Sequence, residues 1–251
     1  MSEVLSLHGG GYRYIKGVFQ YSGGVIAEAG HRIVRARFSK VPSLEDGFNA
    51  IRSHLQSIGR PLSALCACEL RSPKPFTEQG FKEFNKTYVD ALEGFDLLHD
   101  GLNPVARTNV CLEIGPAPMV SVYAFSYTVQ DSSERYSRDF VISGSGEVPE
   151  GKSNYIDHVI CLGDRSPEGL RMKARWVCEE MERRMRLLDF GWENVTGTQV
   201  YTVHDIHPFL ADELIRRGAA KNGLNWHFSR PPVAQLDYEM DVRGVSREIV
   251  L

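Results

Sequence analysis

The sequence predicts an α+β fold made of two tandem repeats, each a mixed β-sheet with helices packed on one face. The main observation is that one order of elements is read twice: strand, Ser-Gly turn, helix ending near a glycine, strand, helix and strand, over residues 21–108 and again over residues 141–238. A second observation is that the long gaps between strands have helical character, as the connections of such units require. We therefore expect one repeat at residues 1–130 and the other at residues 139–251.

The composition is that of an ordinary globular protein, with 42% hydrophobic and 24% charged residues among 251. A net charge of -3 gives no indication of a nucleic-acid or acidic-membrane partner. The apolar runs are shorter than the roughly 18 residues that a membrane helix needs, and no basic region followed by an apolar stretch opens the sequence. We therefore expect a cytoplasmic protein whose five cysteines are core residues and not disulfide partners.

In the first repeat, two strands are expected within residues 13–38, joined by a turn at residues 28–30. Ser43 has the character of a helix N-cap, because two acidic residues follow it in what would be the first turn. Apolar residues then recur at helical spacing as far as Gly59, where the helix is expected to end.

The rest of the first repeat is expected to hold one more helix and three strands. A strand is predicted at residues 64–70 and a helix from Phe76 to about Phe95. Two strands, at residues 107–114 and 119–129, flank a Gly-Pro-Ala-Pro turn. Adjacent strands around a tight turn usually pair with each other, so we expect a hairpin here.

The polar residues 130–138 lack apolar periodicity and are expected to join the two repeats. Ser166 followed by Pro167 is a strong helix start, and the apolar stripe behind it is expected to end at Gly191. The remaining elements are expected to be strands and one short helix, namely strands at 140–142, 196–203, 225–228 and 235–242 and a helix at 208–217.

Four stretches of the first repeat form a set: Tyr21-Ser22-Gly23, the helix ending at Ile58-Gly59, Phe81-x-x-x-Asn85-x-x-Tyr88, and Pro104-Val105-Ala106-Arg107-Thr108. Together they resemble the Rid superfamily, also called YjgF-like. The second repeat is similar but weaker, at residues 145–149, 195–201 and 236–240. The resemblance covers nearly the whole chain and implies two tandem Rid-like (chorismate-mutase-like) domains.

The resemblance also implies where a site would lie. Arg107 falls on the substrate-binding arginine of the family, and Glu239 lies on the acidic closing strand where the family has a functional glutamate. The first repeat has no acid on its own closing strand, and the second has no Pro-Ala-Arg motif. Each repeat thus keeps a different part of the site. Because family members trimerise with sites between subunits, we expect Arg107 to meet Glu239 across an interface, in an oligomer for which a trimer is favoured.

Family enzymes hydrolyse enamines and imines that carry a carboxylate beside the C=N carbon. An arginine suits the carboxylate because its guanidinium binds both oxygens at once. An acid suits the proton transfers to water and to departing ammonia. The resemblance therefore implies a cofactor-independent deaminase of a small carboxylate, and the 2-aminomuconate deaminases of aromatic-compound breakdown are the nearest functional match. Two alternatives stay open: a non-catalytic binding or interaction module of this fold, and a chorismate-processing hydrolase.

Arg107 and Glu239 are the expected catalytic residues. Asp237 and Asp241 alternate with Glu239, and three acids on one strand face would raise a carboxyl pKa, although they would equally suit a plain solvated face. The substrate-binding candidates form a larger set, in which Asn85 has the alternative role of ordering its helix: Tyr21, Ser22, Gly23, Asn85, Trp226, His227 and Arg230.

In the family, residues at the position of Tyr21, Ser22 and Gly23 present backbone amides to the substrate. Trp226, His227 and Arg230 have the composition of a pocket wall for a dicarboxylate, although a rigid hairpin turn would use them as well. His204 and His207 make only a weak metal pattern, because no third ligand is near them in sequence. We expect no metal and no organic cofactor.

Overall fold

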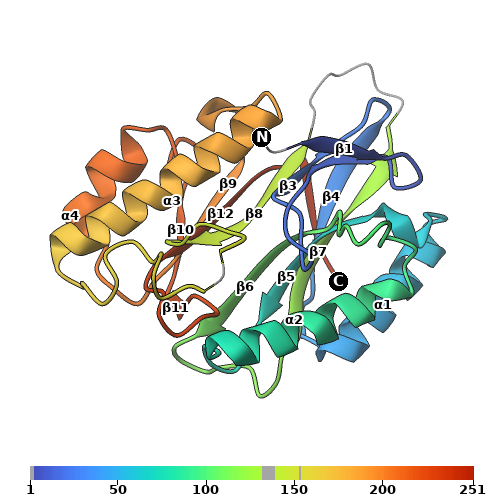
Figure 1. Cartoon of the computed structure of the whole chain (residues 1–251). Coiled ribbons are helices and arrows are strands. Elements are labelled where there is room, and N and C mark those ends of the chain that lie inside the picture. The colour runs from blue at the N-terminus through green and yellow to red at the C-terminus, as the bar shows by residue number, and fades with distance from the viewer. Residues whose placement is uncertain (1–2, 132–138, 153) are drawn as a thin grey trace.

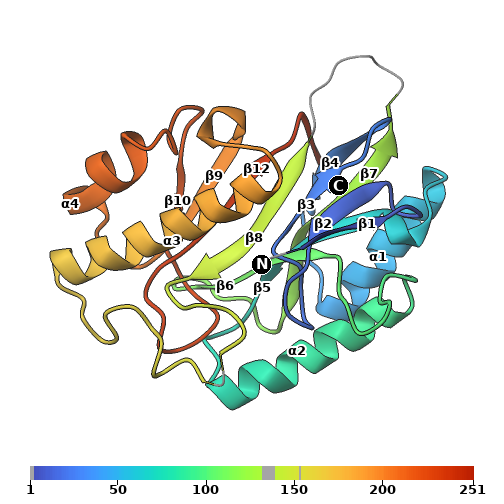
Figure 2. The same ribbon diagram turned by 45° about the horizontal axis from the view of Figure 1, so that its top comes forward.

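Two mixed β-sheets face each other in the computed structural model, which describes residues 3–131, 139–152 and 154–251. Helices α1 (Leu44–Ser57) and α2 (Glu78–Glu93) cover the outer side of one sheet, and α3 (Pro167–Leu187) with the short α4 (His207–Phe209) covers the other (Figure 1). The turned view in Figure 2 shows the same layers, with the two helix pairs on opposite sides of the molecule.

The sheet under α1 and α2 has six strands. Its order is β11 (Ser229–Arg230), β6 (Ala106–Leu112), β5 (Leu65–Arg71), β7 (Ser121–Gln130), β4 (His31–Arg37) and β13 (Arg247–Val250). The sheet under α3 has seven strands. Its order is β1 (Val4–Leu7), β2 (Tyr12–Ile15), β3 (Gly24–Ala27), β8 (Phe140–Gly146), β12 (Glu239–Gly244), β9 (Gly197–Tyr201) and β10 (Asn225–His227).

The internal repeat is visible in the order and direction of the strands. In one sheet β6 is parallel to β5, β5 is antiparallel to β7, and β7 is antiparallel to β4. In the other sheet β10 is parallel to β9, β9 is antiparallel to β12, and β12 is antiparallel to β8. The two four-strand units therefore have the same topology, which confirms the tandem α+β fold predicted from the sequence.

Strands from each half also extend the sheet of the other half. Strand β3 of the first repeat pairs with β8 of the second. In the other sheet, β13 and β11 of the second repeat pair with β4 and β6 of the first, respectively. Strand pairing therefore joins the two predicted repeats at these three places, and Phe76 adds backbone hydrogen bonds to Pro232 and Ala234. The sequence patterns did not indicate β1 or β13. Most of the predicted junction, residues 132–138, lies outside the described residues.

The predicted helix starts are confirmed at two places. The Ser43 hydroxyl accepts the Asp46 backbone N–H at 3.1 Å, and the Ser166 hydroxyl accepts the Gly169 N–H at 3.1 Å. The predicted end of α3 at Gly191 is wrong by one turn, since the helix ends at Leu187. Asp189 takes a φ of 63° and turns the chain there, a conformation that aspartate tolerates better than most residues.

The predicted hairpin of β6 with β7 is wrong, because β5 lies between these strands. Both edges of β7 are already occupied, one by β4 and the other by β5. The segment of residues 113–120 is long enough to cross over one strand, so a Gly/Pro turn joins strands that do not pair.

Apolar side chains fill the space between each sheet and its helices, and a smaller cluster joins the inner faces of the two sheets. Four of the five cysteines are buried, as expected, and Cys161 is half-buried. Further along the inner faces the side chains become charged, as in the buried Arg35–Glu69 pair with its two hydrogen bonds of 2.5 and 2.8 Å. None of the helices in the described ranges combines the length and apolar character needed to cross a bilayer.

Candidate functional site

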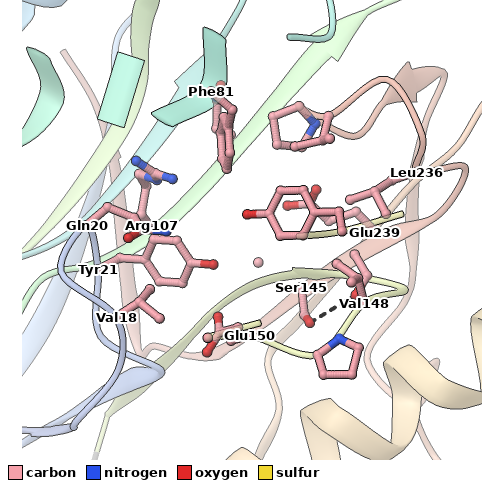
Figure 3. Close-up of a pocket in the computed structure, with 18 residues that line it drawn as sticks. Val18, Gln20, Tyr21, Phe81, Arg107, Ser145, Val148, Glu150, Leu236 and Glu239 are labelled. Atoms are coloured by element: carbon pink, nitrogen blue, oxygen red, sulfur yellow. Dashed lines mark hydrogen bonds between the residues drawn. The ribbon is translucent and has the colours of Figure 1, made fainter. Parts of the chain in front are cut away.

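A pocket lies where β6 and α2 of the first repeat meet β8, β12 and the loop after β8 of the second. It encloses about 590 Å³ of empty space, its open mouth included. Arg107 and Tyr21 lie on one side of the pocket, and Glu239 and Leu236 lie on the other (Figure 3). The two residues predicted to be catalytic therefore line one cavity within a single chain. The sequence-based expectation placed this meeting across an interface between subunits, whereas here the two repeats of one chain supply both halves of the pocket.

Arg107 is held at the pocket by aromatic rings and one amide. Its Nη1 donates to Oδ1 of Asn85 on α2 at 2.8 Å, and its guanidinium carbon lies 4.8 Å from the ring centre of Tyr21 and 4.9 Å from that of Tyr88. Only 4% of the residue is exposed, and within the described ranges no carboxylate oxygen comes within 4.0 Å of it. A buried guanidinium without an acidic partner is suited to bind an anion.

Glu239 is buried at the centre of its sheet and not on a solvated edge. Its strand β12 has β8 on one side and β9 on the other, and 4% of the residue is exposed. Burial raises the pKa of its carboxyl well above the usual range, the neighbouring carboxylate of Asp241 raises it further, and the positive charge of Arg107 acts in the opposite direction. The raised pKa favours the protonated carboxyl, the form that can give a proton.

Asp237 does not share a face with Glu239 and Asp241, contrary to the sequence-based expectation. It precedes the first residue of β12, so the alternation of a strand does not apply to it. Its carboxylate contacts Lys173 of α3 at 2.5 Å and His204 at 3.1 Å. Asp237 thus belongs to an ion-pair cluster on the helix side of the sheet.

Three residues that the sequence patterns did not single out bring polar groups to the pocket. Asn109 follows Arg107 by two residues on β6, and its Nδ2 is buried without a hydrogen-bond partner in the part of the chain that the structure describes. The Oε1 of Gln20 is buried and unpartnered in the same sense. Glu150 lines the pocket and forms a 3.0 Å ion pair with the fully buried Arg184. Of these three residues, only Asn109 could have been found from the sequence, because it follows Arg107 by two residues on a strand and so lies on the same face.

The segment of residues 21–23 contributes a side chain to the pocket but not free backbone amides. The Tyr21 ring and hydroxyl point toward the middle of the pocket (Figure 3). By contrast, the Ser22 N–H donates to the carbonyl of Val105 at 3.0 Å, and the Gly23 N–H donates to that of Ile15 at 2.9 Å. Both N–H groups are already used in backbone hydrogen bonds, so neither is free to donate to a substrate as predicted.

Trp226, His227 and Arg230 are not among the residues that line this pocket. Arg230 makes two hydrogen bonds to the carboxylate of Glu113, at 2.6 and 2.8 Å, on the exposed side of β11. The Trp226 indole N–H donates to the carbonyl of Thr202 at 3.0 Å. The Arg-Pro-Pro turn reaches the pocket through Pro232 and not through its arginine.

His204 and His207 each bind a carboxylate, at 3.1 Å to Asp237 and 2.6 Å to Asp205 respectively. Within the described ranges, no three His, Cys, Asp or Glu side chains are grouped closely enough to hold a metal ion. Among the described residues, the polar side chains that line the pocket carry one guanidinium, amides, phenols, carboxyls and the hydroxyl of Ser145.

Gly144 on β8 makes room for Glu239. A Cβ built at this glycine would overlap Oε1 of Glu239 and press on the side chain of Thr108. We therefore expect Gly144→Ala to displace the Glu239 carboxyl and to lower kcat at least tenfold, since a shift of about 1 Å at a catalytic group costs on the order of 10²-fold.

The matched control is Gly30→Ala, at a turn where a Cβ meets no atom within 4 Å. Its φ of 79° strains alanine, so stability falls while kcat at a temperature that keeps the protein folded stays unchanged. Steady-state kinetics on both variants separate these effects. Equal loss of kcat in the two variants would contradict the role given to Gly144.

Comparison with known proteins assigns the chain to a family. Residues 4–249 match the family model described as 2-aminomuconate deaminase CnbZ. The chain is 47% identical over 251 residues to a 2-amino-5-chloromuconate deaminase of Comamonas testosteroni, with the whole of both chains covered. A crystal structure of a chorismatase is similar in fold, with a TM-score of 0.54 and 11% identity over 94% of this chain and 77% of that one. The YjgF protein of E. coli matches 43% of this chain and 81% of its own, at a TM-score of 0.31 and 14% identity. On the full-length match to the family model and to the curated relative, this chain belongs to the 2-aminomuconate deaminases of the CnbZ family.

Proposed function

We propose that this protein hydrolyses 2-aminomuconate or a substituted relative of it, releasing ammonia, during the breakdown of aromatic compounds. The observation that carries the proposal is one pocket lined by two buried residues, Arg107, which has no carboxylate in contact among the described residues, and Glu239, whose pKa is raised. The guanidinium would bind the carboxylate next to the amino group, and the carboxyl would move the protons.

The steps balance with water as the only co-reactant. Glu239 gives its proton to the enamine carbon, which leaves an electrophilic iminium carbon beside the carboxylate held by Arg107. Water adds to that carbon as its proton passes to the Glu239 carboxylate. Glu239 then protonates the nitrogen, the C–N bond breaks, and ammonia leaves. The remaining O–H proton returns to Glu239, so the products are ammonia and the 2-oxo acid or its 2-hydroxy enol.

The pocket also has a buried donor without a hydrogen-bond partner among the described residues, and an apolar wall. Among the described residues that line the pocket, Arg107 is the one arginine or lysine, so Asn109 Nδ2 is the group we assign to the distal carboxylate. Val148, Val233 and Leu236 form the apolar wall. A chlorine or methyl substituent would pack there, in keeping with the 5-chloro substrate in the name of the Comamonas relative.

The test is ammonia release from freshly generated 2-aminomuconate and 2-amino-5-chloromuconate, measured against the spontaneous rate. Release well above that rate for either compound supports the proposal. Thermal stabilisation by both compounds without release would instead favour a binding protein. No release and no stabilisation would exclude aminomuconates as its ligands.

We expect kcat/KM to fall as pH rises through the raised pKa of Glu239, because the protonated carboxyl is the active form. Glu239→Gln should lower kcat by about 10²- to 10⁴-fold and abolish this alkaline limb. The folded state binds this proton more tightly than the unfolded state, so stability also falls as pH rises above the ordinary range of a carboxyl. Glu239→Gln is therefore expected to be more stable than the wild type at neutral pH, by urea unfolding.

A pH–rate profile of Glu239→Gln that keeps the alkaline limb would assign that limb to another group. Glu150→Gln is the matched control, because Glu150 lines the same pocket but carries an ion pair with Arg184. It is expected to keep the alkaline limb.

The oligomeric state and the location belong to the same proposal. We assign a homo-oligomer, most simply a trimer, on the resemblance to the Rid superfamily, and a cytoplasmic location on the sequence composition. Light scattering coupled to size exclusion would give a mass that is a multiple of the 28.2 kDa chain. A monomer would contradict the assignment of an oligomer.

A further inference from the structure

A second cavity lies at the position that corresponds to the catalytic pocket when the two repeats are exchanged. The pocket of Arg107 and Glu239 is made by β6 of the first repeat and β12 of the second. The topological counterparts of these strands are β10 and β7. Residues of β7 and β10 line the second cavity, which encloses about 800 Å³ of empty space, its open mouth included.

Strand register shows what has replaced the catalytic acid there. Glu239 pairs with Tyr201, the last residue of β9. In the other sheet Ser121 pairs with Arg71, the last residue of β5, so Ser121 is the counterpart of Glu239. Ser121 donates its hydroxyl to the carbonyl of Met119 at 2.8 Å. In the ranges that the structure describes, none of the residues lining the second cavity is an aspartate or glutamate.

Arg71 brings a positive charge to this cavity. Arg71 is 4% exposed, and its Nη1 donates to the carbonyl of the preceding residue, Leu70, at 2.9 Å. Within the described ranges no carboxylate oxygen lies within 4.0 Å of its guanidinium, and the nearby Glu69 is held by two hydrogen bonds to Arg35. Among the described residues the cation is therefore buried at the cavity without a carboxylate in contact with it, as Arg107 is in the catalytic pocket.

The walls of the cavity favour a flat ligand. The Arg71 guanidinium carbon lies 4.1 Å from the ring centre of Tyr123, and His227 stacks on Tyr201 with ring centres 4.9 Å apart. Burial and, after it, the positive charge of Arg71 together lower the pKa of His227 to about 4, so the imidazole is neutral at pH 7. The opposite wall is apolar and includes Leu112 and the Pro116–Pro118 turn.

We propose that this cavity is a second binding site, for a small planar carboxylate of aromatic or conjugated type, held by Arg71 between Tyr123 and the neutral His227. The carboxylate pairs with the guanidinium and the flat apolar part lies against the proline turn. Because a serine stands where the catalytic pocket has its acid, the site binds such a molecule without transferring protons to it.

The probe is 4-fluorobenzoate, followed by ¹⁹F NMR titration. Arg107→Gln removes the cation of the catalytic pocket and is expected to leave binding at the second site intact. Arg71→Gln is expected to weaken that binding at least tenfold, since it removes the charge-assisted pair. Arg247→Gln, on the exposed part of β13, is the matched control and should bind as the wild type does. The neutral 4-fluorobenzamide should bind at least tenfold more weakly than the acid.

Ser121→Glu is the second variant, because it restores a carboxylate at the counterpart of Glu239. An ion pair with Arg71 would then fill the site. Circular dichroism should show this variant to be folded, and the ¹⁹F titration should show that it no longer binds 4-fluorobenzoate there. The proposal is overturned if Arg107→Gln abolishes all binding while Arg71→Gln does not change it. It is also overturned if the wild type binds no 4-fluorobenzoate at this site, as would follow if a second copy of the chain covered the cavity.

Discussion

Replacing Arg107 by glutamine is expected to lower kcat/KM for 2-aminomuconate by about 10²- to 10³-fold. Removing one partner of a buried, hydrogen-bonded charge pair costs roughly 2–5 kcal/mol, and each 1.4 kcal/mol is a factor of ten. The loss should be large because the described part of the pocket lining contains no other arginine or lysine. The measurement is steady-state ammonia release, with folding checked by circular dichroism.

Arg107→Lys separates charge from geometry. A lysine keeps the positive charge but cannot bind both oxygens of the carboxylate, nor lie flat against the Tyr21 and Tyr88 rings as the guanidinium does. It is expected to recover part of the activity, through KM more than through kcat. Arg230→Gln is the matched control, because Arg230 is bound to Glu113 outside the pocket. If Arg230→Gln lost as much activity as Arg107→Gln, the substrate would lie elsewhere than in this pocket.

The sequence was sufficient to predict the tandem fold, because strand and helix periodicity and helix caps are local properties. Ser43 and Ser166 illustrate this, since each caps its helix through an N–H three residues further on. Strand order is not local. Nothing in residues 107–129 indicates that β5 would lie between β6 and β7, and the exchange of β3, β11 and β13 between sheets depends on pairing over long distances along the chain.

The site was predictable where a family motif marked the residue. Arg107, Glu239 and Tyr21 line the pocket, and Asn85 supports Arg107. Asn109 and Gln20 became visible only in three dimensions, because an unpartnered amide is a property of the surrounding packing. The same holds for Asp237, whose pairing with Lys173 depends on where the strand begins.

Lys173→Met is expected to lower the free energy of unfolding by roughly 3–5 kcal/mol, because it removes the buried cation of Glu147 and leaves Asp237 with only Arg165 and His204 among the described residues. Lys173 is fully buried, with its Nζ 2.5 Å from Asp237 and 3.5 Å from Glu147. Glu147 in turn accepts the backbone N–H groups of Asp237 and Tyr238, at 2.6 and 3.0 Å. These bonds fix the chain directly ahead of Glu239, so urea unfolding and ammonia release should both detect the change.

The pH dependence distinguishes an electrostatic cause from simple loss of packing. Burial raises the pKa of Glu147 to about 7, while the backbone N–H bonds and Lys173 act to lower it. The folded state thus binds this proton more tightly than the unfolded state, and stability falls as pH rises from about 4.5 through 7. Removing Lys173 raises the pKa of Glu147 further, so the deficit of Lys173→Met should be larger at pH 8 than at pH 5.

The double variant Lys173→Met/Glu147→Gln should recover part of the lost stability and flatten this pH dependence, because the glutamine that replaces Glu147 has no charge to bury. Lys82→Met, which breaks an exposed ion pair with Glu78, is the control and should change stability by no more than about 1 kcal/mol. A deficit in Lys173→Met that is the same at pH 5 and pH 8 would mean that the lysine acts by filling space. The start of β12, and with it Glu239, would then be set by packing and not by charge.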